Sequence, residues 1–170
     1  MNSKGNIVFL GMMGSGKSSI GHLISKKLKL KFYDIDLLIE KKLNMRIPKI
    51  FIDKGEIFFR QIEKKITLNI LKNEKSVISL GGGAFLNKDI RKEVIKNHVS
   101  FWLNWDNNTL VKRIINSSKR PLAYNLNHKE LINLIEKRSK VYSKALHKIN
   151  CNKLTKSEIV NEIMDIYETN

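Results

Sequence analysis

A length of 170 residues with 42% hydrophobic residues predicts a single domain, residues 1–170, with one sizeable core. No apolar run approaches the roughly 20 residues of a membrane span, and the one cysteine excludes an internal disulfide or a cysteine-based zinc site; we therefore expect a cytoplasmic protein without membrane contact. The formal net charge of +16 is consistent with binding to nucleic acid. The lysines are, however, spread in pairs over several expected helices and do not gather on one face. We therefore expect these helix faces to be solvated and the protein not to bind nucleic acid.

The first predicted element is a strand over residues 7–10, and it leads through Gly-x-x-x-x-Gly-Lys-Ser into a helix over 19–28. In such a turn the backbone N–H groups curl around anionic phosphate oxygens at the positive end of the helix. Lys17 then reaches the outer phosphates, and the Ser18 hydroxyl can ligate Mg²⁺. The motif predicts a nucleoside triphosphate site made by Gly11, Gly14, Ser15, Gly16, Lys17, Ser18 and Ser19.

The next predicted strand, residues 31–36, ends in two carboxylates. Asp34 and Asp36 are two positions apart, so in extended chain both point the same way, beside the phosphate loop if the two strands are neighbours. One can hold Mg²⁺ through its waters, while the other orients a substrate hydroxyl or accepts its proton. Asp36 can instead be the N-cap of a helix over 37–43, which does not exclude catalysis.

Two helices are expected next, a short one from residue 47 with Pro48 in its first turn, and a longer one over 56–71, separated by Gly55. The apolar side of the longer helix is expected to carry Ile57, Phe58, Ile62, Ile66 and Ile70. Arg60 and Glu63 lie three positions apart on it, and they form either a surface pair or part of an anion grip.

The strand predicted over 76–80 ends in Gly81, Gly82 and Gly83. Three glycines at the carboxyl end of a strand allow the backbone to approach a ligand closely, and the alternative is a flexible turn. No Asp ends this strand, where many phosphate-loop proteins hold their metal, so the metal role moves toward Asp34.

In the second half of the chain, strands are expected over 99–103 and 148–151, and helices over 91–96, 129–146 and 157–167. Asp106 is interpreted as the cap of a further helix that carries Arg113. The alternative is that Asp106 takes the metal-binding role of the Asp that is absent from the end of the strand over 76–80. The polar segment 116–125 is the best candidate for a mobile lid, taken as about 116–127. Alternation of strand and helix predicts a three-layer α/β/α fold with a mostly parallel, five-stranded sheet.

Arginine is scarce in this chain, since 26 of the 32 basic residues are lysine. In a chain that uses lysine so freely, a retained arginine indicates a place that needs a planar, bidentate fork. The six arginines are Arg46, Arg60, Arg91, Arg113, Arg120 and Arg138.

The set of motifs closely resembles the shikimate kinase family from about residue 6 to 151. The motifs are Gly-x-x-Gly-x-Gly-Lys-Ser, Phe-Tyr-Asp-Ile-Asp, Ile-Pro-x-Ile-Phe with Gly-Glu-x-x-Phe-Arg-x-x-Glu, Gly-Gly-Gly, Arg-Pro-Leu and Arg-x-x-x-Tyr. None of the motifs after the first is specific for the family by itself, but the order and spacing of the motifs together are specific for it. The resemblance implies a P-loop kinase fold with a lid, and transfer of the γ-phosphate of ATP to the 3-hydroxyl of shikimate by a monomer that acts on small molecules.

The resemblance also implies roles for individual residues. Asp36 contacts the shikimate hydroxyls and acts as the base, Ser18 and Asp34 serve Mg²⁺, and Lys17 with the lid arginine Arg120 completes the catalytic set. The shikimate carboxylate and ring are held by Arg60, Arg138, Gly81, Gly82 and Gly83. Adenine and phosphates are contacted by Arg113, Arg120 and Lys153, although residues 151–155 depart from the Arg and Pro common in the family's adenine loop.

Other functions stay open at this point. Gluconate kinase and nucleotide kinases share the fold, and gluconate also carries a carboxylate, but Asp-x-Asp with Gly-Gly-Gly favours shikimate. A basic nucleic-acid-binding module or a catalytically silent relative that only binds nucleotide are the alternatives from other classes.

Overall fold

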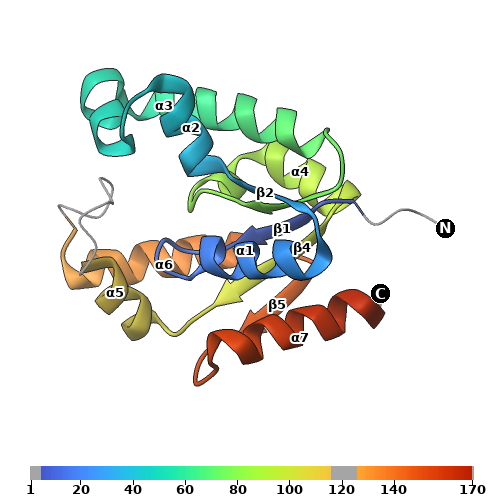
Figure 1. The fold of residues 1–170 in the computed structure, drawn as a ribbon. Helices are drawn as coiled ribbons and strands as arrows, with labels where there is room; N and C mark the ends of the chain where they lie inside the picture. Colours follow the sequence, from blue (N-terminus) through green and yellow to red (C-terminus); the bar gives the residue numbers. More distant parts are fainter. Residues whose placement is uncertain (1–4, 116–125, 170) are drawn as a thin grey trace.

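A computed structural model describes residues 5–115 and 126–169, and within them five parallel strands form one sheet (Figure 1). The order across the sheet is β2-β3-β1-β4-β5. The predicted α/β class, with a central five-stranded sheet, is confirmed, and every pairing in that sheet is parallel. The strands are β1 (Ile7–Leu10), β2 (Lys31–Asp34), β3 (Ser76–Ser79), β4 (Val99–Asn104) and β5 (His147–Asn150).

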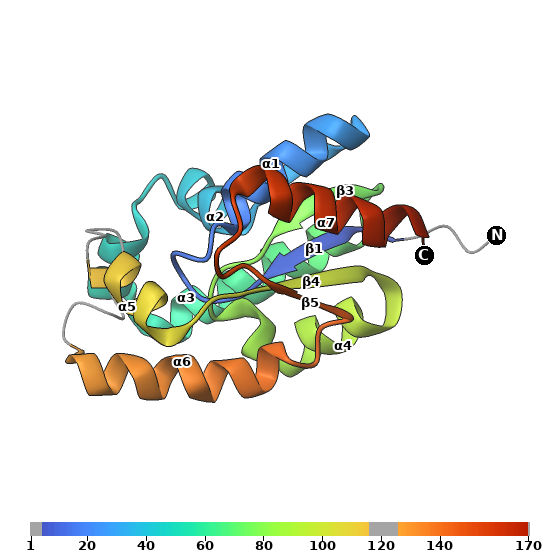
Figure 2. The same ribbon diagram turned by 90° about the horizontal axis from the view of Figure 1, so that it is seen from below.

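Helices cover both faces of the sheet, which gives the three expected layers (Figure 2). On one face lie α1 (Lys17–Leu28) and α7 (Lys156–Thr169). The apolar cluster of the other face includes residues of α2 (Ile35–Leu43), α3 (Ile47–Leu71), α4 (Lys88–Asn97), α5 (Asn107–Ile115) and α6 (His128–Tyr142), with the short 3₁₀ helix η1 (Ala84–Leu86). No helix of the described residues is long and apolar enough to cross a membrane.

The core consists of two apolar clusters, because side chains alternate between the two faces along each strand. In β1, Ile7 and Phe9 join the cluster under α1 and α7, while Val8 and Leu10 join the opposite cluster. Cys151 is fully buried in the first of these clusters, and burial raises the pKa of its thiol to about 12. This cysteine therefore serves as a small buried residue of the core.

Local boundaries differ from the predictions at the two places where the site is built. Strand β2 ends at Asp34, two residues early, because the Asp34 side chain accepts a hydrogen bond from the Leu37 amide and starts α2 there. The prediction that Asp36 lies in extended chain, or caps this helix, is therefore wrong. Helix α1 begins at Lys17, so Lys17 and Ser18 form its first turn.

Helix α3 consists of two helical segments joined at Gly55, whose φ of 82° and ψ of 166° are non-helical, so the predicted break is confirmed. The predicted apolar side of its second segment is wrong in part. Ile57 is 79% exposed, whereas Phe59 and Glu63 are buried. The buried side of α3 thus carries a carboxylate, which helical spacing of apolar residues could not indicate.

Strand β3 lies between β2 and β1, so the condition under which Asp34 and Asp36 were placed beside the phosphate loop, that the two strands are neighbours, is not met. The carboxyl ends of β2, β3 and β1 nevertheless meet at the same edge of the sheet, because all three run parallel. This edge collects the residues of the candidate site.

Candidate active site

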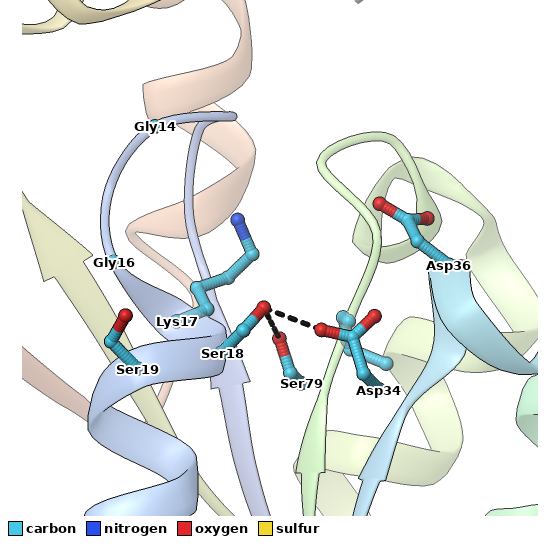
Figure 3. A pocket seen from close by; sticks show the side chains of 9 residues that line it. Gly14, Gly16, Lys17, Ser18, Ser19, Asp34, Asp36 and Ser79 are labelled. Atoms are coloured by element: carbon cyan, nitrogen blue, oxygen red, sulfur yellow. Dashed lines mark hydrogen bonds between the residues drawn. The ribbon is translucent and has the colours of Figure 1, made fainter. Parts of the chain in front are cut away.

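A pocket lies at this edge, between the start of α1 and the start of α2 (Figure 3). It combines residues predicted to bind phosphate with both predicted carboxylates. Its lining consists of Gly14, Gly16, Lys17, Ser18, Ser19, Asp34, Asp36, Ser79 and Leu80. The structure therefore brings together two motifs that are about twenty residues apart in the chain.

The backbone conformation of the loop between β1 and α1 requires glycine at two positions, 14 and 16. Gly14 has a φ of 78° and Gly16 a φ of 91°, values that residues with a Cβ rarely adopt. Gly16 directly precedes α1, so the unpaired N–H groups of the first helical turn lie at the pocket. The buried Lys17 rises from the same turn, and its Nζ donates to the carbonyl oxygens of Gly11 at 3.0 Å and Met12 at 2.8 Å.

Three side-chain oxygens meet beside this turn. The Ser18 hydroxyl donates to Oδ2 of Asp34, and its oxygen lies 3.5 Å from the hydroxyl oxygen of Ser79 (Figure 3). Ser79 is opposite Asp34 in the register of β2 and β3, at the strand end where the sequence lacked an Asp. Sequence reasoning missed Ser79, because the strand was predicted to run to residue 80 and only an Asp was sought at its end.

These oxygens fit Mg²⁺, which prefers hard oxygen ligands and takes one or two protein ligands together with waters and phosphates. Among the described residues, no group of three or more His, Cys, Asp or Glu is placed to hold a metal ion by itself. A metal here would therefore depend on the ligand's own oxygens, as in other phosphate-transfer sites.

Asp34 and Asp36 reach the pocket from different elements. Asp34 ends β2 and caps α2, whereas Asp36 lies in the first turn of α2, where a carboxylate is favoured by the helix dipole. Both line the pocket, so the predicted pair of carboxylates is present although its strand geometry was wrong. Figure 3 shows Asp34 next to Ser18 and Asp36 on the far side of the pocket.

The glycine turn after β3 carries the neighbouring group of charges. A Cβ added to Gly81 would lie 2.6 Å from Oδ1 of Asp36 and 2.7 Å from Oε1 of Glu63, so both carboxylates lie against this residue. A Cβ on Gly83 would lie 2.4 Å from a guanidinium nitrogen of Arg60. Side chains of α2 and α3 therefore lie directly against this turn, and the predicted close approach of a ligand to its backbone stays a prediction.

Glu63 is a residue that the sequence left open between a surface pair with Arg60 and part of an anion grip. Its side chain is only 3% exposed, and Oε2 accepts from Arg60 at 2.6 Å. Burial raises the pKa of the Glu63 carboxyl and nearby Asp36 adds to this effect, while Arg60 and Arg138 oppose it. The ion pair of Arg60 and Glu63 is therefore not a surface pair, since the Glu63 side chain is buried and the Arg60 guanidinium lies against the glycine turn.

Arg138 and Tyr142 reach the same turn from α6. Both are buried; Arg138 Nη1 lies 3.5 Å from the Gly82 carbonyl oxygen, and the Tyr142 hydroxyl donates to that oxygen. Arg138 Nε has no hydrogen-bond partner within the described residues. Arg138, predicted for this site, is therefore brought to it, together with a tyrosine one helical turn later.

A tryptophan supports the loop from the other side. Trp105 Nε1 donates to the Ser15 carbonyl oxygen at 2.9 Å, and the Arg113 guanidinium lies 3.8 Å from the centre of the indole ring while donating to Gly14 at 3.3 Å. Arg113 thus lies against the phosphate loop, and its predicted contact with adenine stays a prediction. Within the described residues Lys153 forms no hydrogen bond or ion pair with the loop, and it lies in the exposed turn before α7.

Two other predictions concern residues near this region. Asp106 caps α5 by accepting from the Thr109 amide at 2.8 Å, so the cap interpretation is confirmed. Arg120 and most of the predicted lid, 116–125, lie outside the described residues.

The sequence matches the family model described as shikimate kinase over residues 13–168. A curated shikimate kinase from Bartonella henselae is 41% identical over 159 residues, which cover 93% of this chain and 76% of that protein. A solved structure of shikimate kinase from Acinetobacter baumannii, in complex with shikimate, aligns with a TM-score of 0.92 at 26% identity and covers 99% of this chain and 95% of its own.

A gluconokinase from Sinorhizobium meliloti also aligns, with a TM-score of 0.59 at 15% identity, over 99% of each chain. At that identity the likeness shows the fold alone.

Proposed function

The chain belongs to the shikimate kinase family, and we propose that it transfers the γ-phosphate of ATP to the 3-hydroxyl of shikimate, giving shikimate 3-phosphate. Membership supports ATP-dependent phosphorylation of shikimate as the reaction. The assignment of steps to residues is our proposal, and it divides the site into two halves.

The donor half consists of residues 11–19 with Asp34 and Ser79. The N–H groups at the start of α1 and the ammonium of Lys17 hold the phosphates and stabilise the charge that develops on the equatorial oxygens. Ser18 would hold Mg²⁺ directly and Asp34 through water. When bound, the metal neutralises charge on the transferred phosphoryl group.

The acceptor half consists of Asp36, Arg60, Glu63, residues 81–83 and Arg138. Arg60 and Arg138 grip the shikimate carboxylate, for which the planar guanidinium fork is suited. Asp36 holds the 3-hydroxyl and accepts its proton as the oxygen bonds to phosphorus and ADP leaves. Glycines at 81–83 leave room for the ring against the backbone.

The remaining assignments stay predictions. Arg113 and Lys153 would contact adenine, and Arg120 would close over the phosphates and exclude water, which competes for the phosphoryl group. A monomeric state, a cytoplasmic location and the absence of nucleic-acid binding are likewise expected from the sequence and family.

The observation that carries this proposal is the position of Gly81. The residue lies beside Asp36 and Glu63, while Gly83, two residues later, lies beside Arg60. A hydroxyl-binding carboxylate and a carboxylate-binding arginine thus border one short turn next to the phosphate loop. A small hydroxy acid is the acceptor that such a turn favours.

The test is ADP release with Mg·ATP, measured in parallel with shikimate, gluconate and nucleoside monophosphates as acceptors. We expect stimulation by shikimate and shikimate 3-phosphate as the product by mass spectrometry. Stimulation by gluconate or a nucleotide without stimulation by shikimate would overturn the proposal.

A further inference from the structure

The hydroxyl of Tyr142 makes a side-chain contact with the glycine turn that the proposed reaction does not use. Tyr142 is 1% exposed and lies at the end of α6, and its hydroxyl donates to the carbonyl oxygen of Gly82 while lying 3.7 Å from the Met12 sulfur. The two acceptors belong to the acceptor half and to the phosphate loop. The hydroxyl has one proton, and a carbonyl oxygen is a stronger acceptor than a thioether sulfur, so the contact with Gly82 dominates over the contact with Met12.

A hydrogen bond to one carbonyl fixes the plane of a whole peptide. All described peptide bonds are trans, so the N–H of Gly83 points opposite to the carbonyl of Gly82. Since that carbonyl is directed at Tyr142 and Arg138, the Gly83 N–H is directed away from them. A glycine turn has little stiffness of its own, because its residues lack a Cβ.

We infer that Tyr142 is a positioning residue, which orients the Gly82–Gly83 peptide for shikimate through its hydroxyl. This rests on the proposed function, because it assigns a purpose to the turn only if shikimate binds there. Arg138 adds a second, weaker contact to the same carbonyl at 3.5 Å. Tyr142 therefore supplies the main restraint, and it leaves Arg138 available for the shikimate carboxylate.

The phenol is suited to donate under all ordinary conditions. Burial raises the pKa of Tyr142 to about 12, so the hydroxyl keeps its proton at neutral pH. Its ring packs against Trp102, at 6.1 Å between ring centroids, which fixes the direction of the hydroxyl. A rigid, always protonated donor holds one peptide orientation, which is what a preorganised binding turn needs.

The test compares Tyr142→Phe with a matched control, Tyr167→Phe. The control removes the same hydroxyl from α7, on the opposite face of the sheet, where the Tyr167 ring packs in the other cluster. For Tyr142→Phe we expect the KM for shikimate to rise roughly tenfold, the value of one hydrogen bond, with the KM for ATP unchanged. The control should change neither constant.

Equal increases in both KM values, or no change in either, would overturn the inference, because a merely structural tyrosine would act on both substrates alike. If wild-type protein fails to phosphorylate shikimate, the proposed function is wrong instead. A second measurement needs no variant: amide exchange of Gly83 should slow when shikimate is added to the wild-type protein. Unchanged exchange at Gly83 would also contradict the inference.

Discussion

The donor and acceptor halves are built in different ways. The donor half is nearly continuous in sequence, because one loop and one helix start provide most of its groups. The acceptor half is assembled from α2, α3, the turn after β3 and α6, over about a hundred residues of chain. The donor half relies on backbone N–H groups, whereas the acceptor half relies on buried charged side chains that hold one another in place.

This difference predicts how each half responds to change. A backbone site tolerates side-chain substitution and depends on the conformation of its glycines, whereas a side-chain site loses specificity when one member of the charge cluster changes. Five variants test this separation, because each should change the use of one substrate and spare the other.

The largest effect is expected for Asp36→Asn. The substitution keeps the shape but removes the proton acceptor, so kcat should fall by about 10²- to 10⁴-fold while nucleotide affinity is kept. The measurement is steady-state turnover together with ATP titration by calorimetry. Asp53→Asn is the matched control, because within the described residues the Asp53 carboxylate pairs with Lys49, at 2.7 Å on the same helix α3. A kcat near that of the wild type would place the base elsewhere.

Arg60→Lys keeps the charge but removes the fork. The KM for shikimate should rise about 10- to 100-fold, since a bidentate, partly buried contact is lost, and the KM for ATP should change little. Arg46→Lys provides the comparison, because Arg46 is 79% exposed and pairs with Glu40 at 3.0 Å. Equal losses for both substrates would show that Arg60 supports the whole site and not the acceptor half.

Gly81 and Gly82, two glycines of the turn, are expected to respond differently to substitution by alanine. Gly81→Ala should raise the KM for shikimate about tenfold, because the new Cβ would displace the Asp36 and Glu63 carboxylates. Gly82→Ala should have a smaller effect, since the nearest atom to its Cβ would be the Met13 nitrogen at 3.4 Å, an ordinary contact. Kinetics of both variants decide the order, and a larger effect at Gly82 would refute it.

The smallest effect belongs to the donor half. Trp105→Phe keeps a ring beneath Arg113 but removes the hydrogen bond to Ser15, so the KM for ATP should rise about 2- to 10-fold. Shikimate binding, measured by calorimetry without nucleotide, should be unchanged. A change confined to shikimate would mean that the two halves are not separable in this way.

The same contrast explains what the sequence could predict. The phosphate loop was predictable because its contacts are local: spacing, glycines and flanking elements all lie within about twenty residues. Asp36 was placed correctly in the pocket but in the wrong element, since the capping hydrogen bond of Asp34 ended β2 earlier than strand propensity indicated.

Long-range contacts were not predictable from local pattern. Tyr142 bonds to Gly82 across 60 positions, and Trp105 bonds to Ser15 across 90. Tyr142 entered the sequence analysis only as part of the Arg-x-x-x-Tyr motif and Trp105 did not enter it, because the polar group of an aromatic side chain gives no sequence signal for its partner. Glu63 was ambiguous for a related reason, since its burial depends on how α3 rotates against the sheet.

Because Cys151 is buried between β5 and α7, its reaction with a thiol reagent can be used to measure how often this part of the protein opens. A thiol that is fully buried and has a pKa near 12 reacts with a thiol reagent only when this edge of the sheet separates. Because the chain has a single cysteine, labelling of the protein reports exposure of the Cys151 thiol alone, and no engineered cysteine is needed. The labelling rate with and without ATP or shikimate would report how strongly each ligand stabilises this edge of the sheet.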